Sequence, residues 1–178
     1  MNETITNRID LLDHFPKNSV CAEIGVLEGF YSHYIFEKTN PKKLYLIDKW
    51  MDEKIYKKVL KKFHNEIKEK RIIVIKGMSE DVLETFKDDF FDWVYVDGDH
   101  RYKGVLKDLE ICRKKVERSG FISGHDYLSM AHEEYKYGVI EAVNHFCEEY
   151  KWQITHLTQE KWSSFVIRQK KKTFKILK

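Results

Sequence analysis

Short apolar runs alternate with longer amphipathic segments along most of this chain, and this alternation constrains the fold more than any other feature. Near-continuous apolar strands that are separated by helices predict a parallel sheet covered by helices on both faces. Because crossovers between parallel strands are right-handed, we expect a doubly wound α/β fold. The five apolar runs span residues 20–24, 44–47, 72–75, 93–96 and 120–123.

The segments between these runs have helical spacing. Residues 53–70 carry Ile55, Val59, Phe63 and Ile67 on one face, which predicts a single helix over that range. An N-terminal helix is expected over residues 6–14. The remaining expected helices span residues 31–37, 79–86, 102–116 and 139–150.

The end of the chain departs from this order. Two β-rich runs, 152–155 and 163–167, follow the last helix and are separated by a polar break. Strands that lie so close in sequence can pair only as an antiparallel hairpin, so we expect a mostly parallel sheet of seven strands. No linker or repeat divides the sequence, which predicts one domain over 1–169 and a basic tail over 170–178.

Composition excludes several classes of protein. The net charge of +3 is too small to indicate nucleic-acid binding. No apolar run approaches the roughly 20 residues that span a bilayer, and no apolar signal segment opens the chain, so we expect a cytoplasmic protein without membrane contact. Three cysteines without metal-ligand spacing indicate reduced thiols.

Polar residues and glycines follow all five apolar runs, in the stretches "EIGVLEG", "IDKW", "KGMSED", "VDGDH" and "GHDY". In doubly wound sheets, ligands bind beyond the carboxyl ends of the strands. Loops are polar in any protein. That tendency does not explain why carboxylates recur at the same point of the first, second, fourth and fifth strands. The pattern therefore predicts a ligand site at this edge.

The first strand ends in a loop typical of nucleoside-cofactor sites. Gly25 and Gly29 allow a tight turn and a close approach to a ligand. Asp48, at the end of the next strand, is placed to accept hydrogen bonds from ribose hydroxyls. The spacing Glu23-x-Gly25-x-x-x-Gly29 differs from the dinucleotide pattern, and Glu28 would repel a pyrophosphate. A cofactor that carries a positive charge fits this loop better.

The fourth and fifth strands end in Asp97 and Asp126, which we expect to converge from neighbouring strands. Paired carboxylates suit a hard cation such as Mg²⁺. His100 is a candidate general base, because imidazole titrates near neutral pH. Asp99 is expected to cap the helix that begins near Tyr102.

Together these motifs resemble class I S-adenosylmethionine-dependent methyltransferases, and more narrowly a small bacterial family with the "VDGDHxY" and "GHDY" strand ends. The similarity runs from about residue 20 to residue 146 and includes "GVIEAVNHF" near its end. It implies a Rossmann-like sheet of seven strands, bound S-adenosylmethionine and often a divalent cation, Mg²⁺ or Mn²⁺, that assists O-methylation.

The resemblance also assigns residues to roles. It implies Asp97 and Asp126 as metal ligands. The chemistry and position of His100, Asp97 and His125 make these three the expected catalytic residues. Metal-dependent relatives carry Asn where this chain has Tyr127, and His125 precedes the aspartate instead, which favours Mn²⁺ or Zn²⁺ over Mg²⁺. The resemblance implies a cofactor near Glu23, Gly25 and Asp48. The full set of expected cofactor-binding residues is Glu23, Gly25, Gly29, Ser32, Asp48, Trp50, Met78, Ser79 and Asp97.

The expected reaction is methyl transfer to a hydroxyl of a small polar acceptor, such as a sugar or a natural product. Residues 129–137 are expected to contact the acceptor, and a second subunit in a homodimer could complete the site. Two alternatives stay open at this point. An NAD-dependent oxidoreductase is opposed by the glycine spacing and Glu28, and a non-catalytic nucleoside-binding module by the clustered Asp97, His100 and Asp126.

Overall fold

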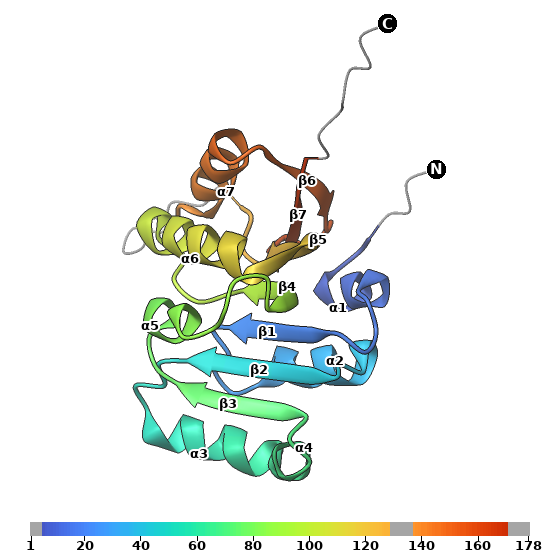
Figure 1. The fold of residues 1–178 in the computed structure, drawn as a ribbon, viewed down its shortest axis with the longest axis vertical. Helices are drawn as coiled ribbons and strands as arrows, with labels where there is room; N and C mark the ends of the chain where they lie inside the picture. Colours follow the sequence, from blue (N-terminus) through green and yellow to red (C-terminus); the bar gives the residue numbers. More distant parts are fainter. Residues whose placement is uncertain (1–4, 129–136, 171–178) are drawn as a thin grey trace, which may run out of the picture.

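The computed structural model describes residues 5–128 and 137–170 (Figure 1). A seven-stranded sheet forms the centre, with strands in the order β3-β2-β1-β4-β5-β7-β6. β1 to β5 are parallel to one another, as the alternating pattern predicted. The strands are β1 Val20–Ile24, β2 Lys43–Asp48, β3 Ile72–Lys76, β4 Phe91–Val96, β5 Val116–Gly124, β6 Trp152–Leu157 and β7 Phe165–Gln169.

The predicted terminal hairpin is confirmed. β7 is antiparallel to both β5 and β6 and lies between them, with Ser123 opposite Val166. The sheet is therefore the doubly wound, mostly parallel sheet of seven strands that the sequence predicted. The loop between β6 and β7 consequently returns to the carboxyl end of β5, beside the candidate site.

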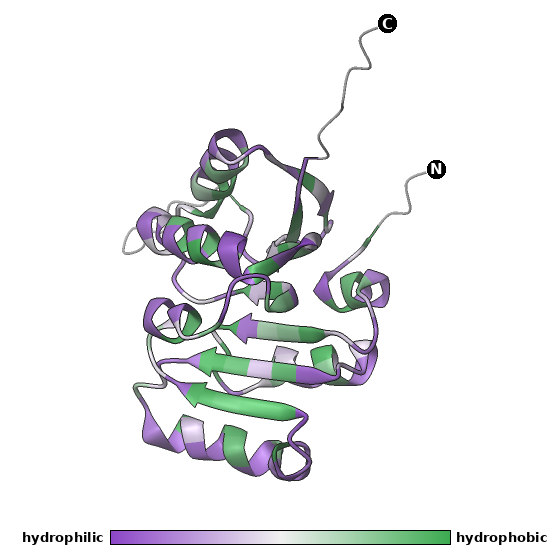
Figure 2. Cartoon of the chain, in the orientation of Figure 1, coloured by the Kyte–Doolittle hydropathy of each residue, from purple (hydrophilic) through white to green (hydrophobic). Residues whose placement is uncertain are grey.

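Helices cover both faces of the sheet. Alternate residues of β4 point to opposite layers, so that Trp93 and Tyr95 pack with α1 to α4 while Val94 and Val96 pack with α5 to α7. Figure 2 shows the apolar strands enclosed by helices with polar outer faces. The helices are α1 Arg8–Leu11, the 3₁₀ helix η1 Leu12–His14, α2 Phe30–Thr39, α3 Glu53–Lys62, α4 His64–Lys68, α5 Ser79–Glu84, α6 Tyr102–Lys115 and α7 Val139–Glu149.

Two predicted boundaries were wrong. The single helix expected over 53–70 is two helices, because Phe63 leaves the helical conformation (φ −106°, ψ 27°). Phe63 is buried beside Gly29, where its ring fills the space that a side chain would need. β5 begins earlier than expected, because its polar first half still pairs with β4 through Phe91 and Val116.

Parts of two other predictions fall outside the described residues. These are residues 129–136 of the expected acceptor loop and residues 171–178 of the basic tail. Across the described residues, each helix is too short or too polar to cross a bilayer.

Candidate functional site

The carboxyl ends of β1, β4 and β5 meet at one edge of the sheet. The Asp97 N–H donates to the Ile24 carbonyl at 2.7 Å, and the His125 N–H donates to the Val96 carbonyl at 3.2 Å. These backbone bonds continue the sheet one residue past the strands. The polar residues that follow β1, β4 and β5 are thereby held in one row.

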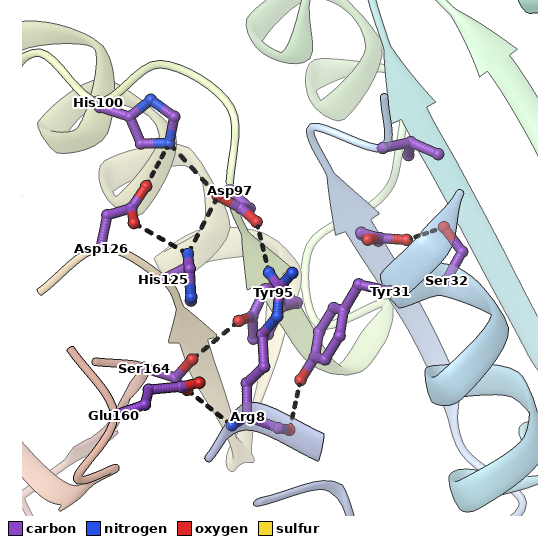
Figure 3. Close-up of polar contacts among 12 residues, drawn as sticks. Arg8, Tyr31, Ser32, Tyr95, Asp97, His100, His125, Asp126, Glu160 and Ser164 are labelled. Carbon is purple, nitrogen blue, oxygen red and sulfur yellow. Dashed lines mark hydrogen bonds and ion pairs between the residues drawn. The ribbon is translucent and has the colours of Figure 1, made fainter. Parts of the chain in front are cut away.

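Two carboxylates and two imidazoles form the centre of this edge (Figure 3). His100 Nε2 lies 2.8 Å from Asp126 Oδ2 and 3.4 Å from Asp97 Oδ1. His125 Nδ1 lies 3.0 Å from Asp126 Oδ1 and 3.9 Å from Asp97 Oδ1. The structure thus brings Asp97, His100, His125 and Asp126 into one cluster, to which β4, β5 and their following loops contribute.

The cluster changes the ionisation of its members. Hydrogen bonds to Asp126 and Asp97 raise the pKa of His100 to about 10. Burial opposes the ionisation of Asp126, but the hydrogen bonds from His100 and His125 outweigh it and hold the pKa of that carboxyl below its ordinary value. His100 is therefore an imidazolium in this arrangement. It can accept a proton only after it has lost its own.

The residues present fit a divalent cation. Asp97, His100 and Asp126 each offer one ligand atom, and these atoms lie within 4.8 Å of one another. Two carboxylate oxygens and one imidazole nitrogen favour Mn²⁺ or another transition ion over Mg²⁺. Tyr127, which replaces the asparagine of metal-dependent relatives, directs its hydroxyl to Asn144 Oδ1 at 2.9 Å.

Three of the eight described residues other than glycine that have positive φ angles lie at the same edge. Leu27, Trp50 and Asp126, which follow β1, β2 and β5, have φ angles of 52°, 33° and 58°. Side chains other than glycine seldom adopt this left-handed region, and such residues gather at ligand sites. The three loops are therefore held in shape by their surroundings rather than by local preference.

The β1 loop brings a buried acid and a close backbone contact to the edge. Glu23 is 1% exposed and accepts a hydrogen bond from the Ser32 hydroxyl. Burial raises the pKa of Glu23 to about 8. At Gly25, with φ of 83°, a Cβ would lie 2.0 Å from the Asp97 carbonyl oxygen. Only glycine allows the β1 loop to pass so near the tip of β4.

Asp48 organises the neighbouring loops. Its carboxylate accepts hydrogen bonds from the N–H groups of Val26 (2.8 Å), Leu27 (2.9 Å) and Trp50 (2.8 Å). The indole of Trp50 is 3% exposed and packs on Tyr56, so its ring lies in the core and offers almost no surface to a ligand. Trp50, which was expected to bind the cofactor, is therefore not open to a ligand in this structure.

The β3 tip contributes an apolar surface. Met78 is 50% exposed, and Met51 in the β2 loop is 85% exposed. Ser79 donates its hydroxyl to Asp108 at 2.6 Å, and burial raises the pKa of Asp108 to about 6. Met78 is thus available to a ligand, whereas the Ser79 hydroxyl is already engaged within the protein.

Asp99 stays out of the cluster. Its carboxylate accepts the Arg101 N–H at 2.9 Å and pairs with the Arg101 guanidinium at 2.6 Å. The N-cap of α6 is Arg101 rather than Asp99, so the expected cap is displaced by two residues. Asp99 therefore shapes the turn that precedes the helix.

Sequence reasoning missed Arg8. This residue of α1 lies with Nη1 3.2 Å from Asp97 Oδ2 and with its guanidinium 4.7 Å from the centre of the Tyr31 ring. Arg8 and Asp97 are 89 positions apart in the sequence. No local motif marks Arg8, because its position depends on how the N-terminal segment packs across the sheet edge.

Aromatic rings border the cluster on the side of the β6–β7 loop. The Tyr137 ring lies 5.3 Å from the His100 ring and 6.2 Å from the Trp162 ring. The cavity among His100, His125 and their neighbours is only about 10 Å³, so the centre is shallow. A wider hollow of about 450 Å³ lies at the other end of β4, around Asp92, away from this chemistry.

The described geometry agrees with comparisons to known proteins. The signature of the family described as "Methyltransferase domain" matches residues 22–127, more than half of the chain. No curated protein matches the sequence significantly. Neither the family nor the similar structures below favour an oxidoreductase.

Several solved structures share the fold. A protein assigned as a caffeoyl-CoA O-methyltransferase from Staphylococcus aureus is 15% identical, with a TM-score of 0.71 over 92% of this chain and 85% of that one. The methyltransferase PaMTH1 from Podospora anserina, bound to SAH, is 17% identical, with a TM-score of 0.70 over 92% and 78%. A SAM-dependent methyltransferase from Aquifex aeolicus is 17% identical, with a TM-score of 0.64 over 85% and 82%.

These similar structures establish the fold, and the family signature covers Glu23 in β1 and also Asp97 and Asp126, which follow β4 and β5. The chain therefore belongs to the methyltransferase-domain family.

Proposed function

We propose that this protein is an S-adenosylmethionine-dependent methyltransferase that acts on a hydroxyl group of a small polar acceptor. The observation that carries the proposal is the position of the Asp97–His100–Asp126 cluster beside the glycine loop of β1. A methyl donor at the loop and an acceptor at the cluster would meet over the tip of β4. The S. aureus and P. anserina structures, whose names include an O-methyltransferase and bound SAH, support the reaction and the cofactor.

The cofactor would lie along the tips of β1, β2 and β3. Gly25 and Gly29 let the β1 loop pack against the Asp97 carbonyl and the Phe63 ring, and the hydrogen bond between Ser32 and Glu23 supports the same loop, which would contact the cofactor. Asp48 retains acceptor capacity for ribose hydroxyls, because each carboxylate oxygen can accept more than one hydrogen bond. The exposed Met78 and Met51 offer an apolar surface for the adenine. The negative charges of this edge suit the sulfonium charge of S-adenosylmethionine.

In the proposed reaction, the acceptor hydroxyl loses its proton to neutral His100, or to solvent where His100 is not free. Its oxygen attacks the methyl carbon, a C–O bond forms, and the C–S bond breaks as S-adenosylhomocysteine leaves. The protein holds the two reactants in line. A cation bound by Asp97, His100 and Asp126 would supply Lewis acidity that lowers the pKa of the acceptor hydroxyl. His100 has two roles that exclude each other: it serves as a ligand when a cation is bound and as the general base when it is neutral and free. His125, whose Nδ1 is 3.0 Å from Asp126 Oδ1, orients that carboxylate.

The aromatic border supports an acceptor that contains a ring. The Tyr137 ring lies next to His100, and the Trp162 ring, which is 37% exposed, lies next to Tyr137. Rings of this kind bind the apolar faces of sugars and of planar natural products. A hydroxyl of such a ring would then point toward Asp97 and His100.

Binding and turnover test the proposal separately. Calorimetry with S-adenosylmethionine and S-adenosylhomocysteine should show one site on the intact protein, and absence of binding to folded protein would refute the cofactor assignment. Asp97→Asn should keep S-adenosylhomocysteine affinity within about threefold and lower methyl transfer by at least about 100-fold. Asp99→Asn is the matched control, since its carboxylate pairs with Arg101 outside the cluster. Full methyl-transfer activity of Asp97→Asn would show that the Asp97 carboxylate is not needed for the reaction.

A further inference from the structure

Arg8 is fixed in place by both its backbone and its side chain. Its N–H donates to Glu160 Oε1 at 2.7 Å, and its carbonyl accepts the Tyr31 hydroxyl at 3.0 Å. Figure 3 shows the side chain rising from α1 between Tyr31 and Tyr95 to reach Asp97. The position of the guanidinium is thus set by α2 and by the β6–β7 loop. It is not a chance contact of a long surface side chain.

The two oxygens of Asp97 have different partners. Oδ2 faces Arg8 Nη1 at 3.2 Å, and Oδ1 faces His100 at 3.4 Å. The side chains of Arg8 and Asp97 are only 24% and 19% exposed, so solvent screens this pair less than an exposed one. A cation held by Asp97, His100 and Asp126 would therefore coordinate Asp97 through Oδ1 alone. It would also lie near a fixed positive charge.

From these contacts we infer that Arg8 is a positioning residue. It holds Oδ2 of Asp97, presents Oδ1 to the cluster, and weakens the binding of divalent cations by charge repulsion. The inference rests on the proposed function, because it assigns Arg8 to the same site. It makes the N-terminal segment a part of that site.

Removal of the charge at residue 8 should strengthen cation binding. In calorimetric titrations with MnCl₂, Arg8→Gln should bind Mn²⁺ at least about tenfold more tightly than the wild type does. The reason is that a repelling charge is lost and Asp97 becomes free to bind the cation through both oxygens. Arg8→Lys keeps the charge and should stay close to the wild type. Arg71→Gln is the matched control, since Arg71 also stacks on a ring, Phe36 at 4.4 Å, but lies away from the site.

Each outcome decides the inference. Tighter Mn²⁺ binding by Arg8→Gln supports it, as does Mn²⁺ binding that appears only in that variant. Equal affinity in the wild type and Arg8→Gln, or no Mn²⁺ binding by either protein, overturns it. If Arg8→Gln does not fold, as judged by circular dichroism, Arg8→Met replaces it, because its side chain keeps an apolar stem on Tyr31. S-adenosylhomocysteine binding, measured on the same samples, shows separately whether the proposed function itself fails.

Discussion

Glu23 is a carboxylic acid with 1% of its surface exposed and one hydrogen bond from a hydroxyl group. Burial disfavours the charged form by more than the Ser32 hydrogen bond and the Arg8 charge favour it, which raises the pKa of Glu23 from 4.5 to about 8. The sequence placed this acid at a strand end, and its burial follows from α2 packing over β1. Its protonation state is therefore a property of the folded protein that local sequence does not reveal.

The shifted pKa predicts how stability depends on pH. Because the folded state keeps the proton of Glu23 up to about pH 8 while the unfolded state releases it near 4.5, folding loses stability as pH rises between these values and then levels off. Glu23→Gln should remove roughly 3–5 kcal/mol of this decline. Urea unfolding of both proteins without cofactor at about pH 5 and about pH 8.5 measures the difference. Equal slopes in the two proteins would show that Glu23 is ionised when folded.

At the scale of elements, the loops after the strands depend on close packing between neighbours. The β1 loop touches the tip of β4 at Gly25, and α3 breaks at Phe63 so that this ring can fill the space beside Gly29. The periodicity of residues 53–70 correctly predicted helix, but it could not predict the break. The apolar residues of this face are compatible with one continuous helix. The break depends on Gly29, which lies elsewhere in the chain and leaves space for the Phe63 ring.

Gly25 provides a test of the contact between β1 and β4. A Cβ at this residue would lie 2.0 Å from the Asp97 carbonyl oxygen, and φ is 83°, so Gly25→Ala is strained in two ways. We expect the free energy of unfolding to fall by roughly 2–3 kcal/mol. Gly98→Ala is the control, because the nearest atom to its Cβ would be 3.6 Å away. Equal unfolding midpoints for the two variants in urea would contradict this account of the loop.

At the scale of the whole molecule, the candidate site draws on both ends of the chain. Arg8 comes from α1, Asp97 and His100 follow β4, His125 and Asp126 follow β5, and Trp162 belongs to the β6–β7 loop. Glu160 of that loop also holds the backbone of Arg8. The N-terminal segment, the strand tips and the terminal hairpin therefore form one continuous edge, which is where the proposed acceptor would bind.

Trp162 allows acceptor binding to be observed directly. It is 37% exposed, whereas Trp50, Trp93 and Trp152 are at most 5% exposed, so it should account for most of the acrylamide quenching of the protein's fluorescence. Trp162→Phe should lose most of that quenching. An acceptor that is methylated in a screen should protect the fluorescence of the wild-type protein from acrylamide. The KM for that acceptor should be at least about fivefold higher in Trp162→Phe than in the wild type, with kcat less affected. If a saturating acceptor leaves the acrylamide quenching unchanged, the acceptor binds away from Trp162.

The sequence by itself determined the order of strands and helices, the terminal hairpin and the row of carboxylates at the strand ends. These features depend on periodicity and on residues close together in the chain, since apolar runs require burial and polar residues end them. Only the tertiary structure decided that Arg8 contacts Asp97, that His100 lies between Asp97 and Asp126, and that the ring of Trp50 is buried. Each of these depends on packing between segments far apart in sequence, because the position of a side chain in a shared site is fixed by the elements around it.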